Sequence, residues 1–153
     1  MSRSAALLAL LKWEQKREPE LSWADAEEYV GFAFPGDYKD LMSAVGSGVF
    51  DHAVEVTSPV EDEDSLDDFF SEIHESRELD GLVPWGRAGQ CTLFWRTDGE
   101  PDEWTITLCD AEFSERESYD GPVTAFLHDL LTGAFTTRLF EFTPGRDPGF
   151  WPR

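Results

Sequence analysis

Histidine and carboxylate side chains are the groups in this sequence whose types could support acid–base or metal chemistry. The three histidines, His52, His74 and His128, fall on three different predicted elements. No two of them have the His-x-x-x-His spacing that places a pair of imidazoles on one helix face for zinc. Asp129 follows His128 directly, but adjacent residues of a helix point to different faces. We therefore expect no catalytic residue, no metal site and no cofactor.

Carboxylates are so abundant that adjacent pairs carry little information about catalysis. The pairs Glu27-Glu28 and Asp67-Asp68 are typical of a solvated face. The acidic run 61–64 could bind calcium weakly, but it lacks the glycine and the terminal glutamate of an EF-hand loop. The chain has no Gly-x-Ser-x-Gly nucleophile elbow. A nucleophile, a base and an orienting group converge on no motif, which indicates that the protein is not an enzyme.

The two glycines Gly46 and Gly48 raise the question of phosphate binding. A phosphate loop runs from a strand through glycines into a helix, because the amides at a helix N-terminus point at the anion. Here a predicted helix comes first, and an extended segment over residues 49–56 follows the glycines. This order predicts that Gly46 ends a helix in the left-handed conformation and that Gly48 turns the chain into a strand.

Residues 1–20 are predicted to form a helix rather than a signal peptide. The apolar run Ala5–Leu11 is at the short limit for the core of a signal peptide. Lys12 and Trp13 follow it, with no small-residue cleavage site. No run approaches the ~20 apolar residues that span a membrane. We therefore expect a cytoplasmic protein that has no membrane partner.

Capping residues and apolar stripes predict four further helices. One begins after an N-cap at Ser22 and ends at Gly31, and another begins after an N-cap at Asp64 or Ser65. Residues 111–119 are predicted to add a short strand. The other predicted elements are helices at 35–46 and 121–133, strands at 91–97 and 104–110 joined by the polar loop 98–103, and an irregular tail over 141–153.

Length and charge narrow the classes of partner. The 153 residues fit one domain, which buries roughly 70% of its unfolded surface. Lysine and arginine number 12 against 32 aspartates and glutamates, a formal net charge of −20. Such a surface repels nucleic acid and anionic membranes, and it attracts basic partners. The alternative interpretation is that the acidic residues only keep the protein soluble.

Several short motifs occur in a defined order along the chain. Trp23 lies on the first core helix, and a hydrophobic-Pro-x-Asp-Tyr-Lys entry leads to the next helix, which ends in Gly-x-Gly-x-Phe. These and later motifs lie at Phe34–Lys39, Gly46–Phe50, Val83–Gly86, Thr92–Thr97, Pro101–Trp104 and Phe126–Gly133. Their order resembles the SUKH superfamily, in its Smi/Knr-type group, over roughly residues 5–140. One departure is Gly89-Gln90, near which many relatives carry Asn or Asp.

The resemblance implies a fold and a class of function. It implies a single α+β domain over residues 1–153, with a mainly antiparallel sheet flanked by helices, and protein binding rather than catalysis. Bacterial members are largely immunity proteins that neutralise cognate toxins of polymorphic or contact-dependent systems, many of them nucleases or deaminases and often basic. The net charge of −20 fits such a partner. Two alternatives stay open: a regulatory or scaffold module, and an acidic DNA mimic that occupies a nucleic-acid-binding protein.

Two acidic segments are the predicted partner-binding face. Their like charges repel one another in the free protein, and an arriving Lys or Arg relieves this repulsion. Such charges mainly speed encounter, whereas tight binding needs a desolvated anchor. We expect the anchor to be a partly exposed Trp85, which follows a proline in a predicted loop. The predicted partner-binding residues are Glu61, Asp62, Glu63, Asp64, Asp67, Asp68, Trp85, Asp98, Glu100, Asp102 and Glu103.

The two cysteines, Cys91 and Cys109, are predicted to be reduced and unpaired. A hairpin register that places Leu93 and Trp95 on the same face as Leu108 sends the two sulfur atoms to opposite faces, because side chains alternate along a strand. A slip by one residue would change this pairing, since apolar residues occur on both faces of the predicted hairpin.

Overall fold

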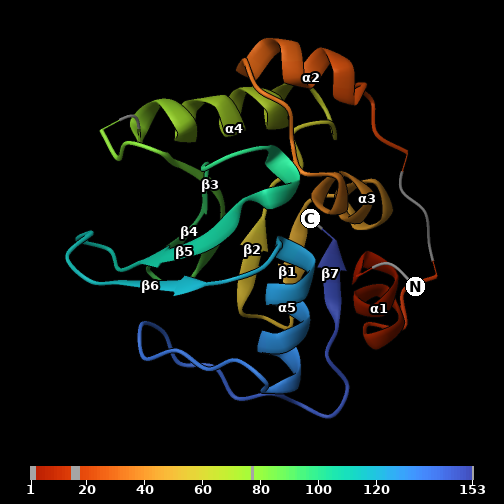
Figure 1. Ribbon diagram of the computed structural model, residues 1–153. Coiled ribbons are helices and arrows are strands. Elements are labelled where there is room, and N and C mark those ends of the chain that lie inside the picture. The colour runs from red at the N-terminus through yellow and green to blue at the C-terminus, as the bar shows by residue number, and fades with distance from the viewer. Residues whose placement is uncertain (1–2, 15–17, 77, 153) are drawn as a thin grey trace.

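Seven strands form one antiparallel sheet in the computed structural model, which describes residues 3–14, 18–76 and 78–152 (Figure 1). The strand order is β6-β5-β4-β3-β2-β1-β7, so β1 to β6 follow the order of the chain and β7 joins the sheet beside β1. The strands are β1 (Gly48–Phe50), β2 (Val54–Val56), β3 (Leu82–Ala88), β4 (Cys91–Arg96), β5 (Thr105–Cys109), β6 (Arg116–Tyr119) and β7 (Phe150–Pro152).

Helices flank this sheet. They are α1 (Arg3–Leu10), α2 (Trp23–Val30), α3 (Gly36–Val45), α4 (Glu63–Glu75) and α5 (Val123–Thr132), with a short 3₁₀ turn, η1 (Pro101–Glu103), between β4 and β5. Helices α2 and α4 lie side by side at one end of the sheet, and α1 lies beside α5 (Figure 1). The predicted α+β class, with a mainly antiparallel sheet flanked by helices, is confirmed.

The N-terminal helix α1 is shorter than predicted. It ends at Leu10, and Lys12 takes a positive φ of 54° that turns the chain. Leu7 is buried in the core, and the indole Nε1 of Trp13 donates to the carbonyl oxygen of Ala44 at 2.9 Å. Residues 15–17 of the predicted helix lie outside the described residues. None of the described helices is long and apolar enough to cross a membrane.

The ends of α2 and α3 follow from their capping residues. Ser22 Oγ accepts a hydrogen bond from the amide of Asp25 at 3.1 Å, and Gly31 ends α2 with a φ of 90°. Gly46 ends α3 by donating its amide to the carbonyl oxygen of Met42 at 2.9 Å. Its φ of 70° is combined with a ψ of −158°. Gly46 therefore closes the helix as predicted, but the predicted left-handed helical conformation is wrong, because the chain is already extended towards β1.

Gly48 allows the last strand to join the sheet. In the pairing of β1 with β7, Gly48 lies opposite Pro152. A Cβ atom at Gly48 would lie 2.3 Å from the carbonyl oxygen of Trp151, so no larger residue fits without moving β7. The tail predicted to be irregular over 141–153 therefore ends in a strand. Three paired residues are too few to show the alternation by which a sequence reveals a strand.

The segment 49–56 also differs from its prediction. It was expected to be extended throughout, but it folds back on itself between β1 and β2. Asp51 and His52 form the turn with φ values of 48° and 59°. These residues tolerate positive φ better than most, although the segment carries none of the Asn-Gly or Asp-Gly pairs that normally reveal a tight hairpin.

The β4–β5 hairpin has the predicted register. Leu93 pairs with Leu108, and Thr92 pairs with Cys109. Because side chains alternate, Cys91 lies on the same face as Leu93, whereas Cys109 lies on the opposite face. Both cysteines are buried and free, as predicted. Burial raises the pKa of both thiols, which keeps them in the less reactive protonated form.

Candidate partner-binding surface

The acidic start of α4 serves the fold as well as the surface. The N-cap is Asp62, whose Oδ1 accepts from the amide of Ser65 at 2.7 Å. The helix therefore begins earlier than the predicted cap at Asp64 or Ser65, because Asp62, the second acid of the run, already accepts from an amide of the first turn. Glu61 is half-buried, and its Oε1 accepts from the amide of Ser47 at 3.2 Å. Two of the six predicted acids here thus contribute to folding.

The remaining predicted acids of α4 are exposed. Asp67 contacts α2, because the hydroxyl of Tyr29 donates to its Oδ1 at 3.0 Å. Asp68 lines a groove between α4 and the sheet. The exposed acids of this helix are Glu63, Asp64, Asp67 and Asp68.

Two acids of the loop between β4 and β5 accept hydrogen bonds that hold the loop in place. Asp98 Oδ2 accepts from Nε of Arg96 at 2.8 Å, with both side chains mostly exposed. Asp102 Oδ1 accepts from the amide of Gly36 at 2.8 Å, at the start of α3. This acid therefore acts as a cap supplied from outside the helix. The two other predicted acids of the loop are exposed: Glu100 and Glu103.

The two acidic segments contact different helices. Asp67 contacts α2 through Tyr29, whereas Asp102 contacts the first residue of α3. In Figure 1, α4 runs beside α2, and the β4–β5 connection meets the start of α3. The sequence therefore identified two acidic regions, which the structure anchors to neighbouring helices rather than to each other.

Trp85 is buried, so the prediction that it is a partly exposed anchor is wrong. Its side chain is 2% exposed. The residue lies in β3 rather than in a loop, and the register shifts between Pro84 and Gly86 because a β-bulge accommodates an extra residue there. Its ring packs against Trp95 and Phe126, with centroid distances of 6.4 and 5.9 Å. Trp85 is therefore a core residue and offers no surface for a partner.

An exposed aromatic patch, Tyr29, Phe70 and His74, lies between α2 and α4. Tyr29 is 49% exposed and Phe70 is 37% exposed. Their ring centroids lie 5.1 Å apart in an edge-to-face arrangement, and the Phe70 ring stacks on His74 at 6.2 Å. The hydrogen bond to Asp67 raises the pKa of the Tyr29 hydroxyl. The patch thus combines apolar area with an acid at its edge.

The sequence does not reveal this patch, because Phe70 directly follows Phe69 of the buried apolar stripe of α4 and cannot be told apart from it by residue type. The structure buries Leu66 and Phe69 of that stripe, and Ile73 is half-buried against the core. A stripe with spacing i, i+3 and i+7 is complete without Phe70. Phe70, the aromatic residue left over from this stripe, was therefore the available signal of an exposed aromatic side chain. Nothing in the local sequence shows that Tyr29 lies beside it.

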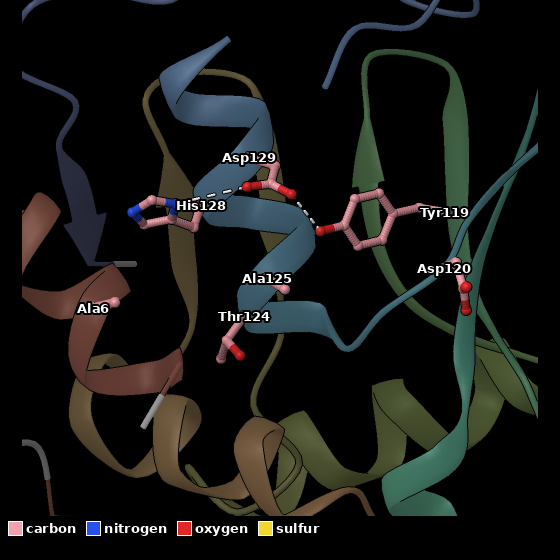
Figure 2. Close-up of a pocket in the computed structure, with 7 residues that line it drawn as sticks. All are labelled: Ala6, Tyr119, Asp120, Thr124, Ala125, His128 and Asp129. Atoms are coloured by element: carbon pink, nitrogen blue, oxygen red, sulfur yellow. Dashed lines mark hydrogen bonds and ion pairs between the residues drawn. The ribbon is translucent and has the colours of Figure 1, made fainter. Parts of the chain in front are cut away.

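A polar pocket of about 350 Å³ lies between α1 and α5 (Figure 2). The hydroxyl of Tyr119 donates to Asp129 Oδ2 at 2.6 Å, and His128 Nδ1 lies 3.8 Å from Asp129 Oδ1. The His128 and Asp129 side chains therefore come within ion-pair distance of each other, although they were expected to point to different faces of the helix. Both the amide and the hydroxyl of Thr124 donate to Asp37 Oδ2, at 3.0 and 2.9 Å. These bonds join β6 and α3 to α5, so they hold the frame of the domain together.

No group of three His, Cys, Asp or Glu side chains that could hold a metal ion occurs in the described ranges. The aromatic patch and the exposed acids of α4 together form one surface arrangement. It offers apolar area and negative charge, which suit a basic protein surface.

The matched family covers the elements that build this surface. No curated protein and no solved structure matches the chain. Residues 20–126, more than half of the chain, match the family described as SMI1-KNR4 cell-wall, SUKH_6. This range contains α2, α3, α4 and the strands β1 to β6, and it ends within α5. The chain therefore belongs to the SMI1-KNR4 family of the SUKH superfamily.

Proposed function

We propose that the protein is a non-catalytic binding domain, an immunity protein that neutralises a basic toxin of a polymorphic or contact-dependent system. The observation that carries this proposal is the exposed aromatic patch of Tyr29, Phe70 and His74 beside the acids of α4. Protein interfaces combine a well-packed apolar centre with a polar rim, and this surface has both parts.

The acids supply attraction and selection. With a net charge of −20, the domain attracts a basic partner over distances comparable to the Debye length, so association speeds up and becomes sensitive to salt. Glu63, Asp64 and Asp68 are exposed on the same helix as Phe70. Asp98 and Glu103 extend the proposed face on the β4–β5 loop.

The aromatic patch supplies the contacts that slow dissociation. Aromatic residues at the centre of an interface account for much of the binding energy when water is excluded around them. Tyr29 and Phe70 already pack on each other at 5.1 Å, so binding orders few additional side-chain torsions. The patch therefore takes the anchoring role that sequence reasoning had given to Trp85.

Family membership supports the immunity role, because bacterial members of the superfamily are largely immunity proteins. The expected partner is the toxin domain encoded beside the gene, of nuclease or deaminase type. The proposed place of action is the cytoplasm, where such a toxin would act.

Co-expression of this protein with the neighbouring toxin domain tests the proposal. We expect the wild-type protein to restore growth and to form a complex with the purified, inactivated toxin domain. Phe70→Ala should raise the dissociation rate by about fivefold or more, because it removes a central contact. Changing Glu63, Asp64 and Asp68 together to Lys should slow association and flatten its dependence on salt. Surface plasmon resonance at two salt concentrations measures both rates.

Phe113→Ala is the matched control, because Phe113 is 41% exposed but lies after β5, where its ring packs on Phe94. It should leave both rates unchanged. Failure of the wild-type protein to bind or protect would contradict the proposed function. Protection combined with wild-type rates in Phe70→Ala and in the charge-reversed variant would show that the partner binds elsewhere.

A further inference from the structure

A groove of about 330 Å³ runs between α4 and the strands β2 and β3, on the flank of α4 that faces the sheet. Carboxylates dominate its walls. Its charged lining residues, which define the α4–β3 groove, are Glu55, Asp68, Glu72, Glu75 and Arg87. Among the described residues, four carboxylates thus face one guanidinium.

The resident cation, Arg87, is shared between the two walls. It lies directly opposite Glu55 in the pairing of β2 with β3. Its Nη2 lies 3.7 Å from Glu72 Oε1, and both side chains are partly exposed. Burial raises the pKa of Glu72, Arg87 opposes this effect, and the surrounding carboxylates add to it. Within the part of the chain that the structure describes, negative charge therefore exceeds positive charge in this groove.

A small pocket that shares residues with the groove is also lined by Trp85, whose buried indole donor is unsatisfied among the described residues. Trp85 lines a small inner pocket of about 20 Å³ together with Glu55, Glu72 and Arg87, the residues that also line the groove. The Trp85 side chain is 2% exposed, and within the described ranges its Nε1–H has no acceptor. Trp95 also has a buried Nε1 with no acceptor there, but its ring packs in the core against Tyr38 at 4.7 Å. An indole N–H can only donate, so the Trp85 side chain is left in need of an acceptor.

One water molecule fits both the size and the chemistry of the inner pocket. About 10–15 Å³ of such volume is enough for one water. A water bound there would accept from Trp85 Nε1 and donate to a carboxylate that the pocket shares with the groove.

We propose that the α4–β3 groove binds an arginine side chain of the protein partner, above a water held by Trp85. This deepens the proposed function and rests on it, because it names the group by which the partner is recognised. Glu55 and Glu72 present carboxylates from opposite walls of the groove. A guanidinium has five N–H donors in a planar fork and can bond to both, whereas an ammonium acts as a compact point charge. The contact between Arg87 and Glu72 shows a guanidinium already at this wall.

The proposal can be tested on the isolated protein with a blocked Gly-Arg-Gly tripeptide as probe. Titration is followed by the NMR resonance of the Trp85 indole N–H, assigned with Trp85→Phe. We expect a saturable shift of this resonance and weaker binding of a blocked Gly-Lys-Gly tripeptide. Glu72→Gln and Glu55→Gln should each weaken Gly-Arg-Gly binding by about two- to fivefold. Arg87→Gln should strengthen it by a similar factor, because the resident competitor is gone.

Glu112→Gln is the charge-matched control, since Glu112 is exposed on the β5–β6 connection and is not among the groove residues. It should leave binding unchanged. A non-saturable shift, equal binding of the lysine probe, or equal affinities in all four Gln variants would overturn the proposal. None of these results depends on the toxin. A complex that forms with the toxin while Gly-Arg-Gly fails to bind would overturn the groove assignment and leave the proposed function standing.

Discussion

The two flanks of α4 carry different chemistry on the same helix. The flank towards α2 presents aromatic rings, with Tyr29 and Phe70 packed at 5.1 Å. The flank towards β2 and β3 presents Glu72 and Asp68 to a charged groove. Between them, Phe69 is buried in the core and is 2% exposed. Positions that are one or two residues apart therefore serve apolar contact, charge and packing.

This difference separates two tasks of recognition. Apolar contact area slows dissociation once water is excluded, whereas charge speeds association and discriminates between partners. A single rigid helix keeps the two surfaces at a fixed distance from each other. The comparison can be tested by changing the residue that supports both flanks, then the start of the helix, and then each flank separately.

Removing the Phe69 ring, which supports both flanks of α4, should have the largest effect on stability. Phe69→Ala takes a ring from the core, where it packs edge-to-face on Phe34 at 5.5 Å, and should lower the free energy of unfolding by about 3–5 kcal/mol. Phe70→Ala, one residue along, should cost less than about 1 kcal/mol because its ring is partly exposed. Urea denaturation measures both values. Equal losses would show that Phe70 is a core residue and that the aromatic flank is not a free surface.

The start of α4 should contribute the next largest effect. Asp62→Ala removes the acceptor for the Ser65 amide at 2.7 Å and should cost about 1 kcal/mol of stability. Asp64→Ala is the control: Asp64 lies in the first turn but is not the N-cap, so its loss should be smaller. Thermal unfolding of the two variants decides between them. A larger loss in Asp64→Ala would restore the cap assignment that the sequence suggested.

The charged flank should make the stability of the folded protein depend on pH. Burial holds the pKa of Glu72 above its ordinary value of 4.5, so ionisation is less favourable in the folded protein than in the unfolded chain. The stability that Glu72 contributes is fully present below that ordinary value, and it is lost as pH rises through the folded pKa. Glu72→Gln should therefore be more stable than the wild type at pH 7, and this advantage should disappear near pH 4.

Urea titrations at both pH values measure the difference, with Glu112→Gln as the exposed control. A Glu72→Gln variant that is less stable than the wild type at pH 7 would show that the contact with Arg87 outweighs the cost of burial. The charged flank would then be a satisfied ion pair rather than a groove in need of a cation.

The smallest expected effect is a change in the pKa of Tyr29 on the aromatic flank. Asp67→Asn removes the charge at the edge of the patch, so the pKa of Tyr29 should fall towards its ordinary value of 10.0. Ultraviolet titration of tyrosinate absorbance measures this, with Tyr29→Phe used to assign the transition. Asp68→Asn should leave that pKa unchanged, because Asp68 lies on the other flank. A shift of the same size in both variants would mean that the two flanks share one electrostatic environment.

Local features of the fold were predictable from the sequence. Ser22, Gly31 and Gly133 mark helix ends as expected, and the register of the β4–β5 hairpin followed from its alternation. These features depend on residues close in sequence. The loop assignment of Trp85 failed because a proline is compatible with a strand where a bulge is present, and the bulge is visible only in the pairing with β4.

The candidate surface was predictable by residue type but not by arrangement. The acidic segments are apparent in the sequence, yet Asp62 and Asp102 turned out to accept hydrogen bonds from backbone amides. An acid near a helix start can accept a hydrogen bond from a backbone amide, so the density of acids in the sequence overstates the number that are available to a partner. The contact of Tyr29 with Phe70 joins two helices and has no local signature.

The strand order carries a consequence for how the chain folds. From β1 to β6 each strand pairs with its sequence neighbour, so the sheet can grow by adding one strand at a time. Strand β7 instead pairs Phe150 with Phe50, and a contact of such sequence separation has a high loop-closure entropy. We expect β7 to dock last and to exchange its amide hydrogens first. Until it docks, the edge of β1 is open to a strand from another molecule, which makes this late step the point at which aggregation competes with folding.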